Sequence, residues 1–252
     1  MRQLLPVYRE DADPAEIYED PRRRQVRERP FVFVNMVASV DGATVVQGVT
    51  EKLGSPGDRH IFFLLRSLAD AILVGAETVR AEGYGPPKVR KEFAPGRAAR
   101  GQLELPRIAI VTRSLQLDWD SPLFGDERSR PFILAPASAD PHRLARAGEV
   151  ADVIAVGEPE LDLPAALRSL ATAGVRALLY EGGPTLNANL LGQGLIDELC
   201  LTISPALVGG GGGATIVGRS LLPEPVDLTL AHLLEEDGSL FCRYLLPTAV
   251  EG

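Results

Sequence analysis

The sequence predicts an α/β protein with a central mixed, mainly parallel sheet, flanked by helices and ending in an antiparallel hairpin. From Phe31 onward, short apolar runs rich in β-branched residues alternate with stretches of helical character, which is the pattern of βαβ units. Near the end of the chain, residues 236–238 read as a tight turn between two further apolar runs. With 252 residues, 45% of them hydrophobic, the chain is long enough to bury a large core.

The expected elements follow in chain order. Apolar and β-branched runs predict strands at 31–39, 71–75, 107–112, 131–135, 152–156 and 176–181. Helices are expected between them at 56–68, 77–82, 163–173 and 185–193. The first of these has a start signal, since Ser55 precedes Pro56 and is followed three residues later by Asp58. Three more strands, at 197–204, 226–235 and 239–246, close the pattern, and 84–106 is expected to be irregular.

The first 29 residues differ in character from the rest. They are charged, contain three prolines and the arginine run 22–24, and show no sustained apolar period. This pattern predicts a short charged arm at 1–29, followed by one domain at 30–252. No apolar run approaches the roughly 18 residues of a membrane helix, and no signal peptide is evident, so we expect a cytoplasmic protein without a membrane partner.

Charge and cysteine content exclude several classes of function. The net charge of −8 argues against a nucleic-acid partner. The cysteines Cys200 and Cys242 form no CxxC pair, and the three histidines are far apart in sequence, so no metal site is expected. A small anionic ligand remains compatible with the sequence where charge is reversed locally.

The strand at 31–39 carries the first candidate residues. Asn35 interrupts its apolar run, and a buried amide costs about 1–3 kcal/mol unless it is hydrogen-bonded, so Asn35 has either a structural partner or a ligand. Ser39, Asp41 and Gly42 lie at the carboxyl end of this strand, where open α/β sheets bind ligands. A simple turn is the alternative for Asp41 and Gly42.

Two strand-to-helix turns are candidate anion sites. Gly75 and Thr78 form one, and Gly182, Gly183 and Pro184 form the other, each placing glycine backbone at the start of a helix. Two such turns on one sheet edge suit a dinucleotide, although a tight turn and a cap would explain each alone. Their spacing matches neither GxGxxG nor GxxxxGK[ST], which excludes a standard Rossmann or P-loop site.

Four other features can carry chemistry. Glu181 ends a strand beside the second turn and can accept hydrogen bonds or act as a general acid or base. Arg66 ends an apolar helix face and is expected to extend to solvent. The glycine run 209–213 is either a linker or a loop that contacts a ligand. Residues 84–107, either a solvated loop or a landing site for an anionic substrate, carry six basic side chains: Lys88, Arg90, Lys91, Arg97, Arg100 and Arg107.

Together these features resemble the pyrimidine reductase of riboflavin biosynthesis, the reductase half of the bifunctional deaminase-reductase, which has the dihydrofolate-reductase-like fold. The resemblance covers about residues 30–246 and rests on Asn35 and residues 39–42, 65–66, 70–80, 181–186 and 207–210. It implies NADPH-dependent reduction of the ribosyl group of a 5-amino-6-ribosylaminopyrimidine 5′-phosphate, or of its undeaminated 2,5-diamino form, to a ribityl group. The deaminase half is absent, because no HxE with a downstream PCxxC exists.

The resemblance also implies roles for individual residues. Asp41, Glu181 and Asn35 are the catalytic candidates, and either Asp41 or Glu181 would supply the proton when the sugar ring opens. Arg66 would hold the substrate phosphate. The remaining substrate contacts would be Asn35, Thr50, Arg90 and Glu181. The cofactor contacts would be Ala38, Gly75, Thr78, Glu82, Gly182, Gly183, Pro184, Thr185 and Leu186.

Two alternatives stay open at this point. One is reduction of dihydrofolate or another pteridine, because the fold is shared and residues 84–106 diverge where substrate is selected. The other is a non-catalytic NADPH-binding protein of the pathway. The family further implies a homodimer, for which the apolar strands 197–204 and 239–246 are the candidate contacts.

Overall fold

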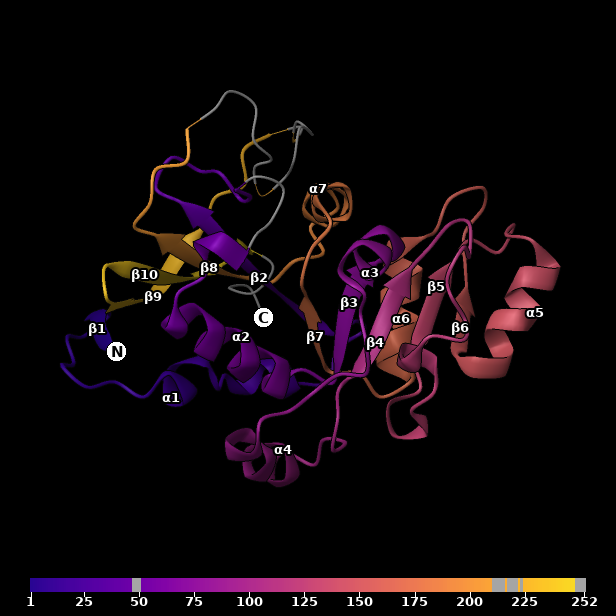
Figure 1. Cartoon of the computed structure of the whole chain (residues 1–252), viewed down its shortest axis with the longest axis horizontal. Coiled ribbons are helices and arrows are strands. Elements are labelled where there is room, and N and C mark those ends of the chain that lie inside the picture. Colours follow the sequence, from indigo (N-terminus) through magenta and orange to yellow (C-terminus); the bar gives the residue numbers. More distant parts are fainter. Residues whose placement is uncertain (47–50, 210–215, 217–221, 223, 248–252) are drawn as a thin grey trace. The chain divides into compact units, whose positions relative to one another are not determined.

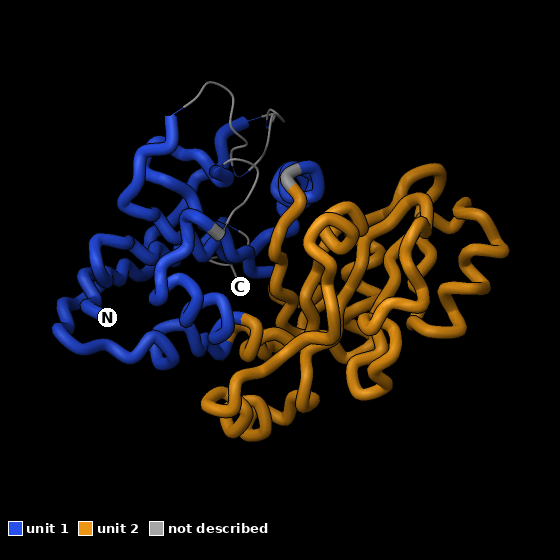
Figure 2. The backbone as a smooth tube through the Cα atoms, viewed as in Figure 1, with its two compact units in different colours: residues 1–21, 32–65, 184–252 blue, residues 22–31, 66–183 orange. Residues whose placement is uncertain are grey.

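The computed structural model describes residues 1–46, 51–209, 216, 222 and 224–247 (Figure 1). The chain divides into two compact units, each assembled from separate segments (Figure 2). Unit 1 contains residues 1–21, 32–65 and 184–252, and unit 2 contains residues 22–31 and 66–183.

Unit 2 is built on parallel strands in the order β7-β3-β4-β5-β6 (Figure 1). Their bounds are Ala71–Gly75 for β3, Arg107–Val111 for β4, Phe132–Ala135 for β5, Asp152–Ala155 for β6 and Ala177–Tyr180 for β7. Strands β5 and β7 are buried along their whole length, as expected of parallel strands covered on both faces. All carboxyl ends therefore meet at one edge of this sheet, and all amino ends meet at the other.

Four α-helices lie wholly in unit 2, and two of them begin at a side-chain cap. They are α3 (Ala76–Glu82), α4 (Ala94–Ala99), α5 (Pro141–Val150) and α6 (Leu163–Thr172), with short 3-10 turns at Lys91–Phe93, Pro122–Phe124 and Glu127–Ser129. The Asp140 carboxylate accepts backbone N–H bonds at the start of α5, and Asp162 does so at the start of α6. Both helices also carry a proline in the first turn, where its missing N–H is harmless.

Unit 1 carries strands in the order β1-β9-β10-β8-β2, of which only β2 and β8 run parallel to each other among the described pairs. Their bounds are Arg2–Leu5 for β1, Phe31–Ser39 for β2, Glu198–Ser204 for β8, Thr229–Glu236 for β9 and Ser239–Leu245 for β10. The helices are α1 (Pro14–Tyr18), α2 (Pro56–Leu68) and α7 (Pro184–Gly192), and 3-10 turns lie at Pro21–Arg24 and Glu51–Leu53. Residues 22–24, Phe31 of β2 and the last three residues of α2 fall in the segments of unit 2.

The predicted fold class is confirmed. Parallel strands separated by helices fill unit 2, and the hairpin β9–β10 turns at residues 237–238. The strands at 31–39 and 71–75 and the helix at 56–68 have the predicted bounds, and the other expected elements differ by at most three residues at either end. None of the helices in the described part of the chain is long and apolar enough to cross a membrane.

Four elements were not predicted. The strand β1 and helix α1 lie within residues 1–29, and β1 pairs with β9. The expectation that 84–106 is irregular is wrong for 91–99, which form a 3-10 turn and α4. The fourth is α5, which is amphipathic but low in mean hydropathy. The division between an arm and a domain at residue 30 stays a prediction.

Candidate active site

Glu181 occupies the carboxyl end of β7 in unit 2. Its backbone N–H donates to the carbonyl of Leu73 at 3.3 Å, which places it beside β3. Its side chain is 3% exposed. A buried carboxylate needs charged or polar partners, because desolvation of an unpaired charge is costly.

Arg66 and Tyr84 provide those partners. Arg66 donates from Nε to one Glu181 oxygen and from Nη2 to the other, both at 2.6 Å, which is the bidentate geometry of a strong ion pair. The Tyr84 hydroxyl donates to Glu181 Oε2 at 2.9 Å, and the Arg66 guanidinium lies 5.8 Å from the centre of the Tyr84 ring. The residues that the sequence assigns to substrate binding at 66 and 181 therefore meet in the folded chain.

The protonation of this triad follows from its surroundings. Burial lowers the pKa of Arg66, but the hydrogen bond and negative charge of Glu181 outweigh burial and raise it overall. Burial and the charge of Glu181 raise the pKa of Tyr84 far above its ordinary value of 10.0. Both groups keep their protons at neutral pH, so they act as donors. Arg66 is 16% exposed, so the expectation that it extends to solvent is wrong.

The glycine turn follows directly after Glu181. Gly182 has φ of 135° and Gly183 has φ of 107°, a region that favours glycine. A Cβ on Gly183 would lie 3.6 Å from Thr78 Oγ1, so the turn after β7 lies next to the turn after β3. A Cβ on Gly182 would meet no atom within 4 Å. This open, side-chain-free backbone beside a hydroxyl fits the pyrophosphate of a dinucleotide.

The other residues assigned to the cofactor are placed as follows. Gly75 ends β3 and precedes α3 without a side-chain cap bond, and Glu82 is exposed at the end of α3. Pro184 begins α7, in which Thr185 is exposed and Leu186 is half-buried. Their contacts with a cofactor remain predictions.

Unit 1 carries a second group, centred on Asp41. The carboxylate accepts hydrogen bonds from the Ser39 hydroxyl at 2.5 Å and from the backbone N–H groups of Val208 at 3.2 Å and Gly209 at 2.8 Å. These bonds, that of Ser39 foremost, lower the pKa of Asp41 to about 2. Asp41 therefore carries no proton at neutral pH, which argues against it as the general acid. It ties the loop after β8 to the end of β2.

The remaining candidates of unit 1 lie along β2. Asn35 is half-buried opposite Cys200, and its contact with a ligand stays a prediction. Ala38 is buried opposite Ile203. Thr50 and the glycines 210–213 lie outside the described residues.

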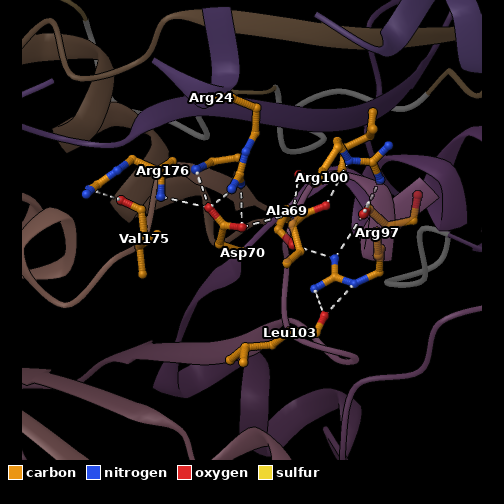
Figure 3. Close-up of polar contacts among 12 residues, drawn as sticks. Arg24, Ala69, Asp70, Arg97, Arg100, Leu103, Val175 and Arg176 are labelled. Atoms are coloured by element: carbon orange, nitrogen blue, oxygen red, sulfur yellow. Dashed lines mark hydrogen bonds and ion pairs between the residues drawn. The ribbon is translucent and has the colours of Figure 1, made fainter. Parts of the chain in front are cut away.

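Three of the six basic residues in 84–107 have a different role from the two that the sequence offers, whereas Lys88 and Lys91 are exposed. Arg97 is 1% exposed and binds the carbonyl oxygens of Ser67, Ala69 and Leu103 (Figure 3). Arg100 also donates to the Ser67 carbonyl at 3.1 Å. Arg107 pairs with Asp152 and lies 3.5 Å above the ring of Phe132. These three arginines stabilise the fold, so the prediction that they form a landing site or a solvated loop is wrong.

Arg90 and Tyr84 complete the segment. Arg90 lies 3.6 Å from Glu92, and its contact with substrate stays a prediction. Tyr84 is not among the site residues predicted from the sequence, although its position directly after the helix-ending Gly83 could have marked it as a candidate. Across the described residues, no cluster of three or more His, Cys, Asp or Glu side chains could hold a metal ion.

Comparison with known proteins identifies the family. Residues 30–240 match the model of the RibD C-terminal domain. The chain belongs to this family. Two relatives of this RibD C-terminal domain protein carry the name 2,5-diamino-6-ribosylamino-4(3H)-pyrimidinone 5′-phosphate reductase. The protein of Archaeoglobus fulgidus is 31% identical over 196 residues, covering 77% of this chain and 89% of its own. That of Methanothermobacter thermautotrophicus is 30% identical over 215 residues, covering 83% and 95%.

Among solved structures, the RibD C-terminal domain protein resembles a pyrimidine reductase-like protein from Corynebacterium diphtheriae. The TM-score is 0.76 at 28% sequence identity, and the similarity covers 86% of this chain and 92% of that one. The likeness therefore extends over both units rather than over one of them.

Proposed function

We propose that this RibD C-terminal domain protein is the NADPH-dependent reductase that converts the ribosyl group of a 2,5-diamino-6-ribosylamino-pyrimidinone 5′-phosphate into a ribityl group in riboflavin biosynthesis. The two relatives named for that reaction match most of this chain and most of their own. The observation that carries the proposal is the bidentate pair of Arg66 and Glu181, because it joins the two residues expected to contact substrate.

The residues supply recognition and orientation for this reaction. When bound, reduced nicotinamide would supply the hydride that adds at C1′ as the bond from C1′ to the ring oxygen breaks, and that oxygen would take a proton. The planar fork of Arg66 suits a phosphate, as it suits a carboxylate. Glu181 can accept hydrogen bonds from sugar hydroxyls. Holding the sugar carbon in one orientation reduces the entropic part of the barrier.

The preference for NADPH over NADH is part of the proposal. Gly183 lies next to Thr78 and Gly182 has free space where a Cβ would stand, which suits the pyrophosphate that both cofactors share. The identity of the proton donor also remains a proposal. Since Asp41 has a pKa of about 2 and the Glu181 carboxylate accepts bonds from Arg66 and Tyr84, we favour a water molecule held by Glu181 as the proton donor.

The test follows the loss of NADPH absorbance with three substrates: the diamino pyrimidine phosphate, its deaminated form and dihydrofolate. We expect turnover with the first, weaker turnover with the second and none with dihydrofolate, and slower turnover when NADH replaces NADPH. Oxidation with dihydrofolate alone would show a pteridine reductase. NADPH binding without turnover of any of the three would show a non-catalytic protein. Elution near the 27.0 kDa monomer mass in gel filtration would contradict the expected dimer.

A further inference from the structure

Tyr84 is a third donor to the Glu181 carboxylate, and it comes from a different element than Arg66. Its hydroxyl binds Oε2 at 2.9 Å, the same oxygen that accepts from Arg66 Nη2. Arg66 belongs to α2, whereas Tyr84 follows α3. The two donors therefore reach Glu181 from separate parts of the chain.

The backbone places Tyr84 at this position by a specific turn. Gly83 ends α3 in the left-handed conformation, with φ of 61° and ψ of 50°, and its N–H donates to the Val79 carbonyl. The N–H of Tyr84 donates to the same carbonyl at 3.2 Å. This turn reverses the chain directly after the helix that carries Thr78 and Glu82. Tyr84 thus links the helix assigned to the cofactor with the glutamate assigned to the substrate.

A phosphate that binds Arg66 must compete with Glu181, because a guanidinium uses the same fork for both anions. Glu181 would then lose its bidentate partner while its side chain stays buried. The hydrogen bond from Tyr84 does not depend on Arg66, so it can keep Oε2 in place when Arg66 turns to the phosphate. The raised pKa of Tyr84 means that this donor stays protonated throughout the range in which an enzyme is assayed.

We propose that Tyr84 is a positioning residue of the reductase site, whose hydroxyl holds the Glu181 carboxylate in its reactive orientation while the substrate phosphate occupies Arg66. This rests on the proposed function. The alternative is that the Tyr84 ring only fills space beside Arg66. Tyr84→Phe separates the two, because phenylalanine keeps the ring and its contact with the guanidinium but removes the donor.

The test compares Tyr84→Phe with a matched control, Tyr8→Phe. The Tyr8 hydroxyl also donates to a carboxylate, that of Glu10, but on a 58% exposed side chain of unit 1. We expect Tyr84→Phe to lower kcat with the diamino pyrimidine phosphate by roughly tenfold, with the KM for NADPH changed by less than about twofold. The control should leave both constants within about twofold. An unchanged kcat in Tyr84→Phe would overturn the proposal.

A thermal unfolding cycle tests the same link without substrate. Tyr84→Phe, Glu181→Gln and the double variant should be non-additive by about 2 °C or more in Tm, since each single change weakens the Tyr84–Glu181 hydrogen bond and the double variant loses that bond only once. Additive shifts would overturn the proposal, whatever the activity. An inactive wild-type protein with non-additive shifts would instead refute the proposed function and leave the link between Tyr84 and Glu181 standing. An active protein with additive shifts would support the proposed function and refute the link between Tyr84 and Glu181.

Discussion

The two edges of the sheet in unit 2 use arginine in different ways. At the amino ends of the strands, arginines bind main-chain carbonyls where helices end: Arg97 at Ser67 and Ala69, Arg130 at the end of α5, and Arg176 at Ala171 of α6. At the carboxyl ends, Arg66 binds the side chain of Glu181 instead. Carbonyl oxygens at a helix end are fixed in place and lack intrahelical donors. A carboxylate is a charged partner that another anion can replace.

Asp70 shows how closely the amino-end edge is held together. Its carboxylate accepts bonds from Arg24 at 2.6 and 2.7 Å, from Gln102 and from the N–H groups of Arg176 and Ala177 (Figure 3). Arginines at the amino ends bind carboxylates as well as carbonyls, since Arg24 pairs with Asp70, and Arg107 and Arg130 pair with Asp152. These amino-end arginines stabilise the fold, whereas the contact of Arg66 with an anionic ligand is a prediction.

The largest expected effect is at Arg97. Arg97→Met should lower the free energy of unfolding by about 4 kcal/mol, because it leaves buried carbonyl oxygens without donors. Arg97→Lys should lose about half as much, since it keeps the charge but not the fork. Urea unfolding measures both. As a control, Arg113→Met, at a side chain 77% exposed, should change stability by less than about 0.5 kcal/mol. A loss below about 1 kcal/mol for Arg97→Met would contradict the structural role.

The second-largest expected effect is at Arg66, at the carboxyl-end edge of the sheet. Arg66→Lys should lower kcat/KM for the diamino pyrimidine phosphate by about a hundredfold, equivalent to about 2.7 kcal/mol, because an ammonium cannot bind phosphate as a fork. Its stability should fall by only about 1 kcal/mol, since a cation still faces Glu181. Steady-state kinetics and urea unfolding of the same preparation give both values. Equal activity in Arg66→Lys and the wild type would remove the distinction between the two edges.

The smallest expected effect is the contribution of Asp70 to stability, and it depends on pH. Burial raises the pKa of Asp70, but its bonds to Arg24, Ala177, Gln102 and Arg176 lower it more, so the net pKa lies below the ordinary 3.8. The unfolded chain then binds the proton more readily, so this stabilisation is complete above about pH 5 and is lost as pH falls through the folded pKa. Asp70→Asn should cost about 1–2 kcal/mol at pH 7 and less at pH 3. A difference that stays constant between these two pH values would contradict this explanation.

Local pattern predicted most of the fold and part of the site. Strands such as 71–75 are fully apolar and the helix at 56–68 has a clear start signal, so both were predicted with the observed bounds. The glycine turn at 182–183 was predicted because a strand end, two glycines and a proline lie together in sequence. The meeting of Arg66 and Tyr84 with Glu181 was not deducible from spacing, since 115 and 97 residues separate the partners.

The prediction for Arg97, which rested on the number of basic residues in 84–107, was wrong for a different reason. Its partners are main-chain carbonyls, which every residue has, so no sequence signal shows that this arginine is buried. The helix α5 was missed because its mean hydropathy is low, although Asp140 and Pro141 marked its start.

The pairing of β1 with β9 has a consequence for the order in which the protein is made. Arg2 binds Glu235, 233 residues away, so the sheet of unit 1 cannot be completed until residues 229–236 have left the ribosome. The strands of unit 2 all lie between residues 71 and 180. A nascent chain stalled after α7 therefore already contains every strand of unit 2, whereas β9, the partner of β1, has not yet been synthesised. Protease treatment of such stalled chains should leave residues 71–180 protected and cut within residues 1–21.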